Sequence, residues 1–162
     1  MTYIPLQIEL LEFAGLSSSL VAMRLPKGSK SDTCGHELGV SDRRLARSLI
    51  LAGTDHAKFS RGIVVWLRLE MQTGWMIEFE TYRHGVECLS TSSTMHNELK
   101  RLKGVELAEA KQAGLPDKVY TRIATLSYQV LRAMYLARRK HRHPDWQIFC
   151  DFIRTLPYFD EL

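Results

Sequence analysis

The segment that decides the fold is residues 83–96, which read RHGVECLSTSSTMH. An Arg-His pair closes an aromatic-rich element, and a run of serines and threonines follows it. The guanidinium of Arg83 offers a rigid fork of donors to a phosphate or to the edge of a heterocycle, and hydroxyls and loop amides donate to phosphate oxygens. Composition alone favours a polar surface loop in which Ser93 or Thr94 caps a helix.

The chain before this segment predicts short strands and helices. Residues 6–13 alternate apolar and polar side chains as a strand does, and residues 17–23 predict a short helix behind serines that can cap it. Residues 27–40 are rich in Gly, Ser, Lys and Asp and predict a mobile loop. A second helix is expected to begin with Ser41 as its N-cap and to end at Gly53.

The middle of the chain contains one clear strand and one ambiguous segment. Residues 63–69 are β-branched and aromatic, which predicts a strand. Residues 75–83 fit a strand and a helix, because their aromatic side chains recur with both periods. Residues 85–94 predict a loop, and residues 95–102 and 105–113 predict two short helices.

The C-terminal third predicts two helices. A long helix is expected over residues 119–137, because one of its faces collects Val119, Ile123, Leu126, Val130, Ala133 and Ala137. A second helix starts at Pro144 and has a stripe made of Trp146, Phe149, Ile153 and Leu156. No repeat or linker divides the chain, so residues 1–162 are predicted to form one α+β domain with long helices packed on a small, mostly antiparallel sheet.

The composition is that of an ordinary soluble domain. The chain has 162 residues, of which 45% are hydrophobic and 25% charged, and this excludes disorder. No apolar stretch is long enough to span a membrane, and the N-terminal residues do not resemble a secretory signal. The three cysteines, Cys34, Cys88 and Cys150, are an odd number without close spacing, so we expect a cytoplasmic protein.

Charge and short motifs limit the classes of function. The net charge of +4 suits a small phosphorylated ligand and is too weak to argue by itself for nucleic acid. The basic run at residues 138–143 fits either a helix C-terminus, where cations meet the negative end of the macrodipole, or a site that faces phosphate or pyrimidine. No zinc spacing, glycine-rich phosphate loop or nucleophile elbow is present, so we expect no metal.

The segment quoted above resembles the signature of the flavin-dependent thymidylate synthases, the ThyX family. That signature places Ser, Glu, Ser and Arg at fixed intervals after Arg-His-Arg. Arg83 and His84 match the opening pair, and Ser93 matches the second serine. The departures are Gly85 for the third basic residue, Cys88 for the first serine, Thr91 for the glutamate and Met95 for the last arginine.

Other segments extend the resemblance over almost the whole chain. Residues 114–122 are similar to the family's Leu-Pro and Tyr-Thr-Arg entry to its active-site helix. Residues 42–59, which end at Phe59, resemble its flavin-side turn and the helix before it. The resemblance also predicts a helix over residues 75–84. Two departures matter. Only 21 residues separate Ser93 from Leu115, where the family has a longer α/β segment. In addition, Gln112 stands where the family has an arginine, and Tyr128 where it has an asparagine.

The arginine that the family directs at the pyrimidine has two candidates here. Arg139 precedes Trp146 by the family's interval, and we assign the role to it on that ground. Simple periodicity places Arg138 nearer to the apolar stripe and favours Arg138 as the inward residue.

The resemblance implies a homotetramer that binds FAD and a pyrimidine nucleotide, with a folate as one-carbon donor and NADPH as reductant. It implies that Arg83, His84 and Phe59 contact the cofactor, that Arg83 also contacts the substrate, and that Ser93 and Arg139 bind substrate and act in catalysis. The sequence leaves two functions open. One is flavin-dependent one-carbon transfer to a deoxyuridine-type nucleotide, and the other is a non-catalytic oligomeric binding protein that has kept the fold and lost flavin.

Overall fold

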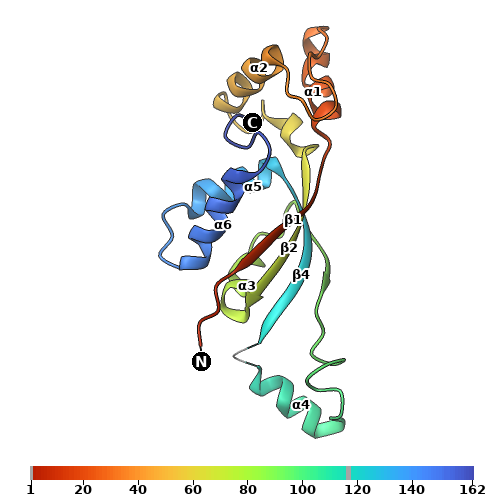
Figure 1. Ribbon diagram of the computed structural model, residues 1–162, viewed down its shortest axis with the longest axis vertical. Coiled ribbons are helices and arrows are strands. Elements are labelled where there is room, and N and C mark those ends of the chain that lie inside the picture. Colours follow the sequence, from red (N-terminus) through yellow and green to blue (C-terminus); the bar gives the residue numbers. More distant parts are fainter. Residues whose placement is uncertain (1, 116–117) are drawn as a thin grey trace.

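The computed structural model describes residues 2–115 and 118–162, and within them a four-stranded antiparallel sheet organises the chain (Figure 1). The strand order is β1-β2-β4-β3. The strands are β1 (Gln7–Ala14), β2 (Val64–Gln72), β3 (Val86–Thr91) and β4 (Val119–Ser127). The antiparallel sheet and the helices around it confirm the predicted α+β class.

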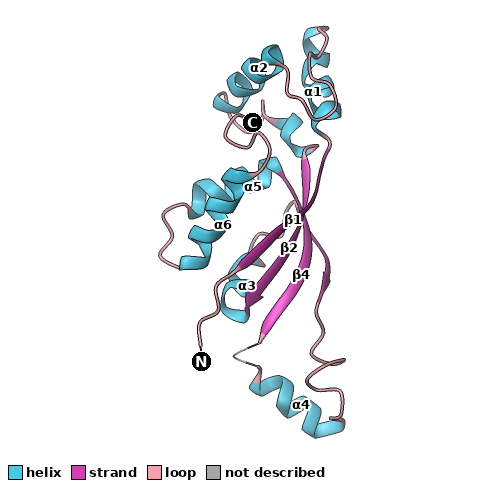
Figure 2. Cartoon of the chain, in the orientation of Figure 1, coloured by secondary structure: helices cyan, strands magenta, loops and turns pink. Residues whose placement is uncertain are grey.

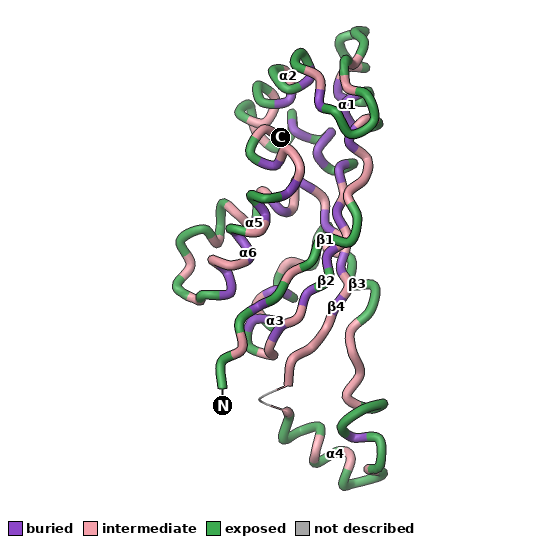
Figure 3. Tube along the Cα trace, viewed as in Figure 1, coloured by how far each residue is buried: buried purple, intermediate pink, exposed green. Residues whose placement is uncertain are grey.

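Six α-helices lie in the described part of the chain, together with two short 3-10 turns (Figure 2). The helices are α1 (Leu16–Arg24), α2 (Val40–Leu51), α3 (Thr73–Phe79), α4 (Gly104–Ala113), α5 (Tyr128–Arg138) and α6 (Pro144–Thr155). The 3-10 turns are η1 (Leu25–Lys27) and η2 (Lys58–Arg61). Helices α1 and α2 lie at one end of the sheet and α4 at the other, where α4 buries none of its residues (Figure 3).

The central strand β2 has one buried and one open face. Val65, Leu67, Leu69 and Met71 alternate along it and are almost completely buried. The residues between them, which include Trp66 and Arg68, are half-buried or exposed. This period of two is the pattern of a sheet covered on one side only.

Aromatic side chains fasten α3 to α6 in the core. Trp75 of α3 lies 5.0 Å from Trp146 and 5.6 Å from Phe149 of α6, measured between ring centroids. The Glu78 carboxylate accepts a 2.7 Å hydrogen bond from the Trp146 indole N–H. Large buried rings contribute much of the apolar area of a core, and tilted pairs add to that stabilisation. The helix that the resemblance predicts over residues 75–84 is present as far as Phe79, whereas residues 80–84 form turns and irregular structure.

The largest error of the sequence-based prediction is the long helix over residues 119–137. These residues form β4 and then α5, and the change falls at Ser127, whose Oγ accepts a hydrogen bond from Val130 N–H as the N-cap of α5. Val119, Ile123 and Leu126 share a face only at helical spacing, whereas in β4 the face that is buried carries Arg122, Ala124 and Leu126. The predicted face is wrong in α5 as well, because Ala133 and Ala137 are exposed. The side chains that α5 buries are Tyr128, Leu131 and Met134.

Several smaller expectations are also corrected. Residues 86–91 of the expected loop form β3, because they pair with β4, and residues 95–102 form turns rather than a helix. Ser41 lies inside α2 instead of capping it, and Gly53 follows the C-cap of that helix. The strands near residues 6–13 and 63–69, and the helices near 17–23, 105–113 and 144–155, are confirmed.

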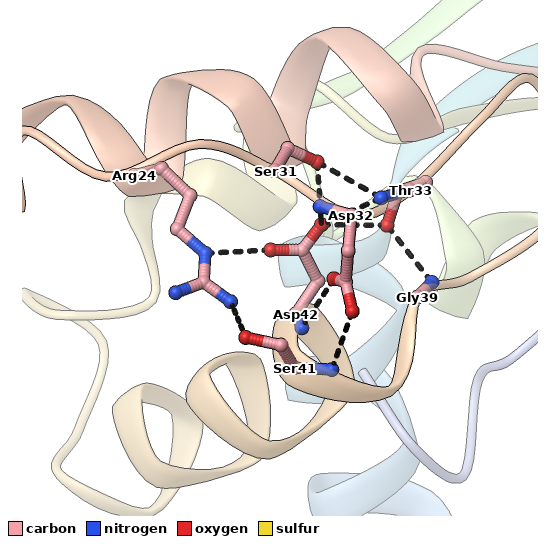
Figure 4. Close-up of polar contacts among 7 residues, drawn as sticks. All are labelled: Arg24, Ser31, Asp32, Thr33, Gly39, Ser41 and Asp42. Carbon is pink, nitrogen blue, oxygen red and sulfur yellow. Dashed lines mark hydrogen bonds and ion pairs between the residues drawn. The ribbon is translucent and has the colours of Figure 1, made fainter.

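A buried carboxylate ties the segment expected to be a mobile loop to α1 and α2 (Figure 4). Asp42 is fully buried and accepts hydrogen bonds from Arg24 Nε at 2.6 Å and from Thr33 Oγ1 at 2.7 Å. Ser31 also donates to it. Asp32 in turn accepts from the backbone N–H groups of Ser41 and Asp42, and so caps α2 from a distance. This network replaces the local cap that Ser41 was expected to provide.

The Asp42 network predicts loss of stability in acid. Burial alone would raise the pKa of Asp42, but hydrogen bonds from Ser31, Thr33 and Arg24 lower the pKa to about 2. Because the folded-state pKa lies below the unfolded one, the stabilisation is complete above pH ~4 and is lost as the pH falls toward ~2. We expect Asp42→Asn to have a lower free energy of unfolding than the wild type above pH ~4. This difference should shrink by about 2 kcal/mol when the pH is lowered to ~2.

Urea denaturation of both proteins across this pH range measures the difference. The exposed Asp160, which pairs with Arg154, gives the control variant Asp160→Asn. If the difference in free energy of unfolding between wild type and Asp42→Asn does not change with pH, the proposed ionisation of Asp42 is contradicted.

Two glycines with positive φ predict very different responses to alanine. Gly15 has φ +83°, and a Cβ there would lie 1.9 Å from the carbonyl oxygen of Gly62. Gly28 has φ +58°, and a Cβ there would meet nothing within 4 Å. We expect Gly28→Ala to lower the free energy of unfolding by about 1 kcal/mol through backbone strain, and Gly15→Ala by about 3 kcal/mol because overlap is added. Equal losses in urea denaturation would show that the Gly15–Gly62 approach is not tight.

Candidate functional site

The structure separates the residues of the signature segment. Arg83 and His84 are exposed in the turn between α3 and β3. Ser93 follows the other end of β3, where its Oγ accepts a 3.1 Å hydrogen bond from Met95 N–H. Because β3 has six residues at about 3.3 Å each, His84 and Ser93 lie beyond opposite ends of a strand that spans about 17 Å.

The other two predicted site residues lie on different elements. Phe59 is buried in η2, and Arg139 is the exposed C-cap of α5. The inward arginine is Arg138, as periodicity predicts. Its Nε donates to the Tyr82 hydroxyl at 2.7 Å, and its guanidinium lies 4.7 Å from the centroid of the Trp146 ring.

His84 lines a hollow of about 460 Å³ on the open face of the sheet. We call it the α5 hollow, because the N-terminus of α5 forms one of its walls. Its other walls are the end of η2 with the start of β2, and the turn that leads into β3. Its lining includes Arg61, Val64, His84, Gly85, Glu87, Thr125, Ser127, Gln129 and Val130. A volume of this size suits a ligand as large as a mononucleotide.

The arginine of the α5 hollow is held in place by a neighbour. Arg61 Nε donates to Gln129 Oε1 at 2.6 Å, and Gln129 Nε2 donates to the Thr54 carbonyl at 3.4 Å. This leaves the two terminal amino groups of Arg61 available to a ligand. Ser127 Oγ accepts from Val130 N–H and keeps its own hydrogen to donate. The N-terminal end of α5 adds a positive dipole end to this wall.

The α5 hollow presents both donors and acceptors. Arg61 and the hydroxyl of Ser127 donate, whereas the exposed carboxylate of Glu87 accepts. Thr125 lies opposite Glu87 in the β3–β4 pairing, so both side chains belong to the open face of the sheet. A mixture of donors and acceptors over apolar walls fits the edge of a heterocyclic base better than it fits a phosphate alone.

Gly85 allows the signature turn to close against α5. Its φ is +80°, and a Cβ there would lie 2.5 Å from Cγ2 of Val130. The backbone of the turn therefore lies directly against the wall of the hollow, and any side chain at residue 85 would require Val130 to shift.

A second hollow of about 440 Å³ is lined by residues from the end of α1, from α2 and from η2 with the segment before it, and we call it the α2 hollow. Phe59 and Met23 form part of its apolar floor. Lys27, His56 and Lys58 surround it, together with Asp55. The turn η2 thus contributes Phe59 to one hollow and Arg61 to the other.

Sequence reasoning missed Arg61, Ser127 and Gln129. Arg61 lies two residues beyond Phe59, where the resemblance to the flavin-side turn ends. Ser127 carried a usable signal, because serine is a preferred N-cap. That signal was hidden by residues 119–137, whose spacing fits an uninterrupted helix. Gln129 became a site residue only through the position of the true helix start.

The described residues contain neither a metal cluster nor a membrane span. No three His, Cys, Asp or Glu side chains gather there as a metal ion would require. None of the described helices is long and apolar enough to cross a membrane. Among the cysteines, Cys150 is buried, and burial together with nearby Asp151 raises its pKa to about 11, so it remains a thiol at neutral pH.

The fold built on this antiparallel sheet, in the order β1-β2-β4-β3, is similar to that of solved flavin-dependent thymidylate synthases. No protein-family model matches the sequence, and no curated protein matches it. The likeness is carried by three-dimensional structure.

Three solved structures share the fold. ThyX from Helicobacter pylori, complexed with FAD and dUMP, superposes with a TM-score of 0.75 at 13% identity and covers 96% of both chains. A second structure of the same enzyme with FAD and dUMP gives 0.76, also at 13% identity, over 96% of this chain and 95% of the other. The UMP/dUMP methylase PolB from Streptomyces cacaoi, bound with 5-Br dUMP, gives 0.70 at 13% identity over 93% and 88%. The predicted ThyX-like fold is confirmed.

The contact between Gly85 and Val130 predicts an energetic coupling. We expect Gly85→Ala to lower the free energy of unfolding by about 2 kcal/mol, through positive φ and overlap with the valine methyl group. Val130→Ala in the same chain removes the overlap, so the double variant should be more stable than the sum of the single changes by about 1 kcal/mol.

Chemical denaturation of the four proteins of this cycle measures the coupling. The matched cycle of Gly28→Ala with Val130→Ala should be additive, because a Cβ at Gly28 would have no atom within 4 Å. Additivity in the Gly85 cycle would contradict the contact.

Proposed function

We propose that this protein binds a pyrimidine nucleotide in the α5 hollow. The observation that carries the proposal is the hollow itself, which joins Arg61, His84 of the signature turn and the N-terminus of α5 on a ThyX fold. Its volume of about 460 Å³ suits a mononucleotide. The Helicobacter enzyme is complexed with dUMP and the Streptomyces methylase with 5-Br dUMP, which supports a ligand of the same class.

The polar groups of the hollow suit a uracil-type base. Such a base presents carbonyl oxygens as acceptors and a ring N–H as donor. Arg61 and Ser127 supply donors, and Glu87 supplies an acceptor. Val64 and Val130 supply apolar walls for the faces of the ring. Arg83, which is exposed beside His84, is proposed as a further phosphate contact.

The α2 hollow fits part of a flavin cofactor, which we propose to be FAD. Phe59 and Met23 offer apolar surface to an aromatic ring, and Lys27, His56 and Lys58 offer donors to a diphosphate. When bound, FAD supplies the redox chemistry of the proposed one-carbon transfer, while residues of this chain bind and orient the nucleotide. A folate donor and NADPH would complete the reaction that the family resemblance implies.

Ser93 and Arg139 lie outside the α5 hollow of their own chain. Their proposed roles at the substrate therefore require the hollow of another subunit, which agrees with the proposed homotetramer. We accordingly propose that residues 1–162 form one domain of a cytoplasmic tetramer with shared sites.

Calorimetry with dUMP tests the proposed nucleotide site. We expect Arg61→Ala to raise Kd by about tenfold to hundredfold, because a hydrogen bond to a charged group is lost. Arg154→Ala is the matched control, since Arg154 is exposed and pairs with Asp160. An unchanged Kd in folded Arg61→Ala would rule out the α5 hollow as the nucleotide site.

The visible absorption of the purified protein decides between the two functions. A flavin spectrum that weakens in Phe59→Ala supports the flavin-dependent enzyme with its cofactor beside η2. Colourless protein that takes up no added FAD but binds dUMP selects the non-catalytic binding protein.

A further inference from the structure

The chain from residue 118 to residue 143 carries seven Lys or Arg residues and no Asp or Glu. Three of the seven are neutralised or held by neighbours. Lys118 pairs with Glu98, Arg122 pairs with Glu80 at 2.7 Å, and Arg138 contacts Tyr82 and lies near Glu78. The other four are Arg132, Arg139, Lys140 and Arg142.

These four residues form what we call the α5 cationic stripe. Three of them are exposed and Arg132 is half-buried, and no described residue forms a hydrogen bond or ion pair with their side chains. At 100° per residue, Gln129, Arg132 and Arg139 fall within about a third of the helix circumference. Arg132 and Arg139 therefore lie on one flank of α5, next to the face that buries Tyr128, and Lys140 and Arg142 continue beyond the C-terminal end of the helix.

The stripe begins at the α5 hollow. Gln129 lines the hollow and holds Arg61 there, and Arg132 lies one turn further along the same face. From Gln129 to Arg139 the helix rises by about 15 Å. This length accommodates a short run of backbone phosphates, since even in a duplex each strand advances about 3.4 Å along the axis per nucleotide.

Helix electrostatics explains only part of the stripe. Cations at the end of α5 interact favourably with the negative end of its dipole, which accounts for Arg139 and Lys140. Arg132 lies in the middle of the helix, and Arg142 precedes the positive end of α6. Asp145, the acid in the first turn of α6, is buried and accepts hydrogen bonds from Tyr3 and Leu6. It leaves Arg142 without an acidic partner.

We propose that the α5 hollow receives a pyrimidine base of a single-stranded oligonucleotide, whose phosphates lie along the α5 cationic stripe. The proposal rests on the proposed function of the hollow and extends its ligand from a mononucleotide to a strand. The hollow holds Glu87, which repels a phosphate but can accept from a base. The unpaired cations lie outside the hollow, where the neighbouring phosphates of a strand would be.

A single strand fits this arrangement better than other polyanions. Its bases are free to enter a hollow, whereas a duplex would have to flip one out at a cost in stacking. A flat anionic membrane would contact the stripe and leave the hollow unused. Phosphate contacts of this kind make affinity strongly dependent on salt.

Fluorescence anisotropy with a labelled oligo-dU of about ten nucleotides tests the proposal. Four phosphate contacts predict a slope of about −3 for log K against log salt. The triple variant Arg132→Gln, Lys140→Gln, Arg142→Gln removes three contacts, so we expect a slope nearer −1 and at least a tenfold loss of affinity at ~50 mM salt. The variant leaves Arg139 in place, because that residue is also proposed to contact substrate.

The charge-matched control is Lys100→Gln, Lys103→Gln, Lys111→Gln, which removes three positive charges on and before α4, at the far end of the molecule. It should leave the slope unchanged. Equal losses of affinity for oligo-dU in the two triple variants would overturn the proposed role of the stripe. Affinity for oligo-dU no higher than for dUMP would also overturn it. Binding to anionic lipid vesicles without binding to oligo-dU would also overturn it, and equal affinity for oligo-dA would overturn the pyrimidine in the hollow.

The same measurements separate this proposal from the proposed function. If wild-type protein binds dUMP in calorimetry but does not bind oligo-dU, the proposed nucleotide site is supported and the proposed binding of a strand is overturned. If it binds oligo-dU through the stripe but does not bind dUMP, the mononucleotide ligand is ruled out and the binding of a strand is supported. Circular dichroism of both triple variants confirms that they are folded, and Gln is a good helix former in α5.

Discussion

Tyr128 stands where β4 becomes α5, and the arrangement of the site depends on its contacts. Its backbone N–H donates to the Ile63 carbonyl at 2.9 Å, which joins the start of α5 to the start of β2. Its hydroxyl donates to the Pro157 carbonyl at 2.6 Å, and its ring lies between Phe13 and Phe159, with centroids 5.8 and 5.6 Å away. Burial raises the pKa of this hydroxyl, which keeps it a hydrogen-bond donor. One side chain thus connects the first strand, the first residues of α5 and the C-terminal segment.

How much of this could be predicted from the sequence depends on how many structures each pattern allows. Helix α6 was predictable because Pro144 fixes its start and four apolar residues recur at helical spacing. The β4–α5 change was not, because Val119, Ile123 and Leu126 share a face at helical spacing, whereas in β4 Leu126 lies on the opposite face from the other two. Pairing with β2 decides in favour of the strand, and that pairing is a long-range contact. Local periodicity cannot contain this information.

The same limit explains which residues of the α5 hollow the sequence could single out. His84 stood out because the Arg-His pair is contiguous and resembles a known signature. Arg61 and Gln129 are 68 residues apart and meet only when β2 and β4 pair. Phe59 lies in a turn beside a hollow, but its position relative to Arg61 follows from the geometry of η2 and not from the resemblance. Arg139 and Arg138 differ by about 100° around α5, so an interval counted along the chain could not show which of them points inward.

Turn η2 lines both hollows, and it is closely packed against the rest of the fold. Turn η2 is closed by hydrogen bonds from Ser60 N–H and Oγ to the Ala57 carbonyl and from Gly62 N–H to the Phe59 carbonyl. A Cβ at Gly62 would lie 2.4 Å from Ser19 Oγ, so α1 packs directly against this turn. Interiors packed this closely resist small displacements. A ligand beside Phe59 and a ligand beside Arg61 would therefore both contact η2, and the packing of this turn would set the distance between them.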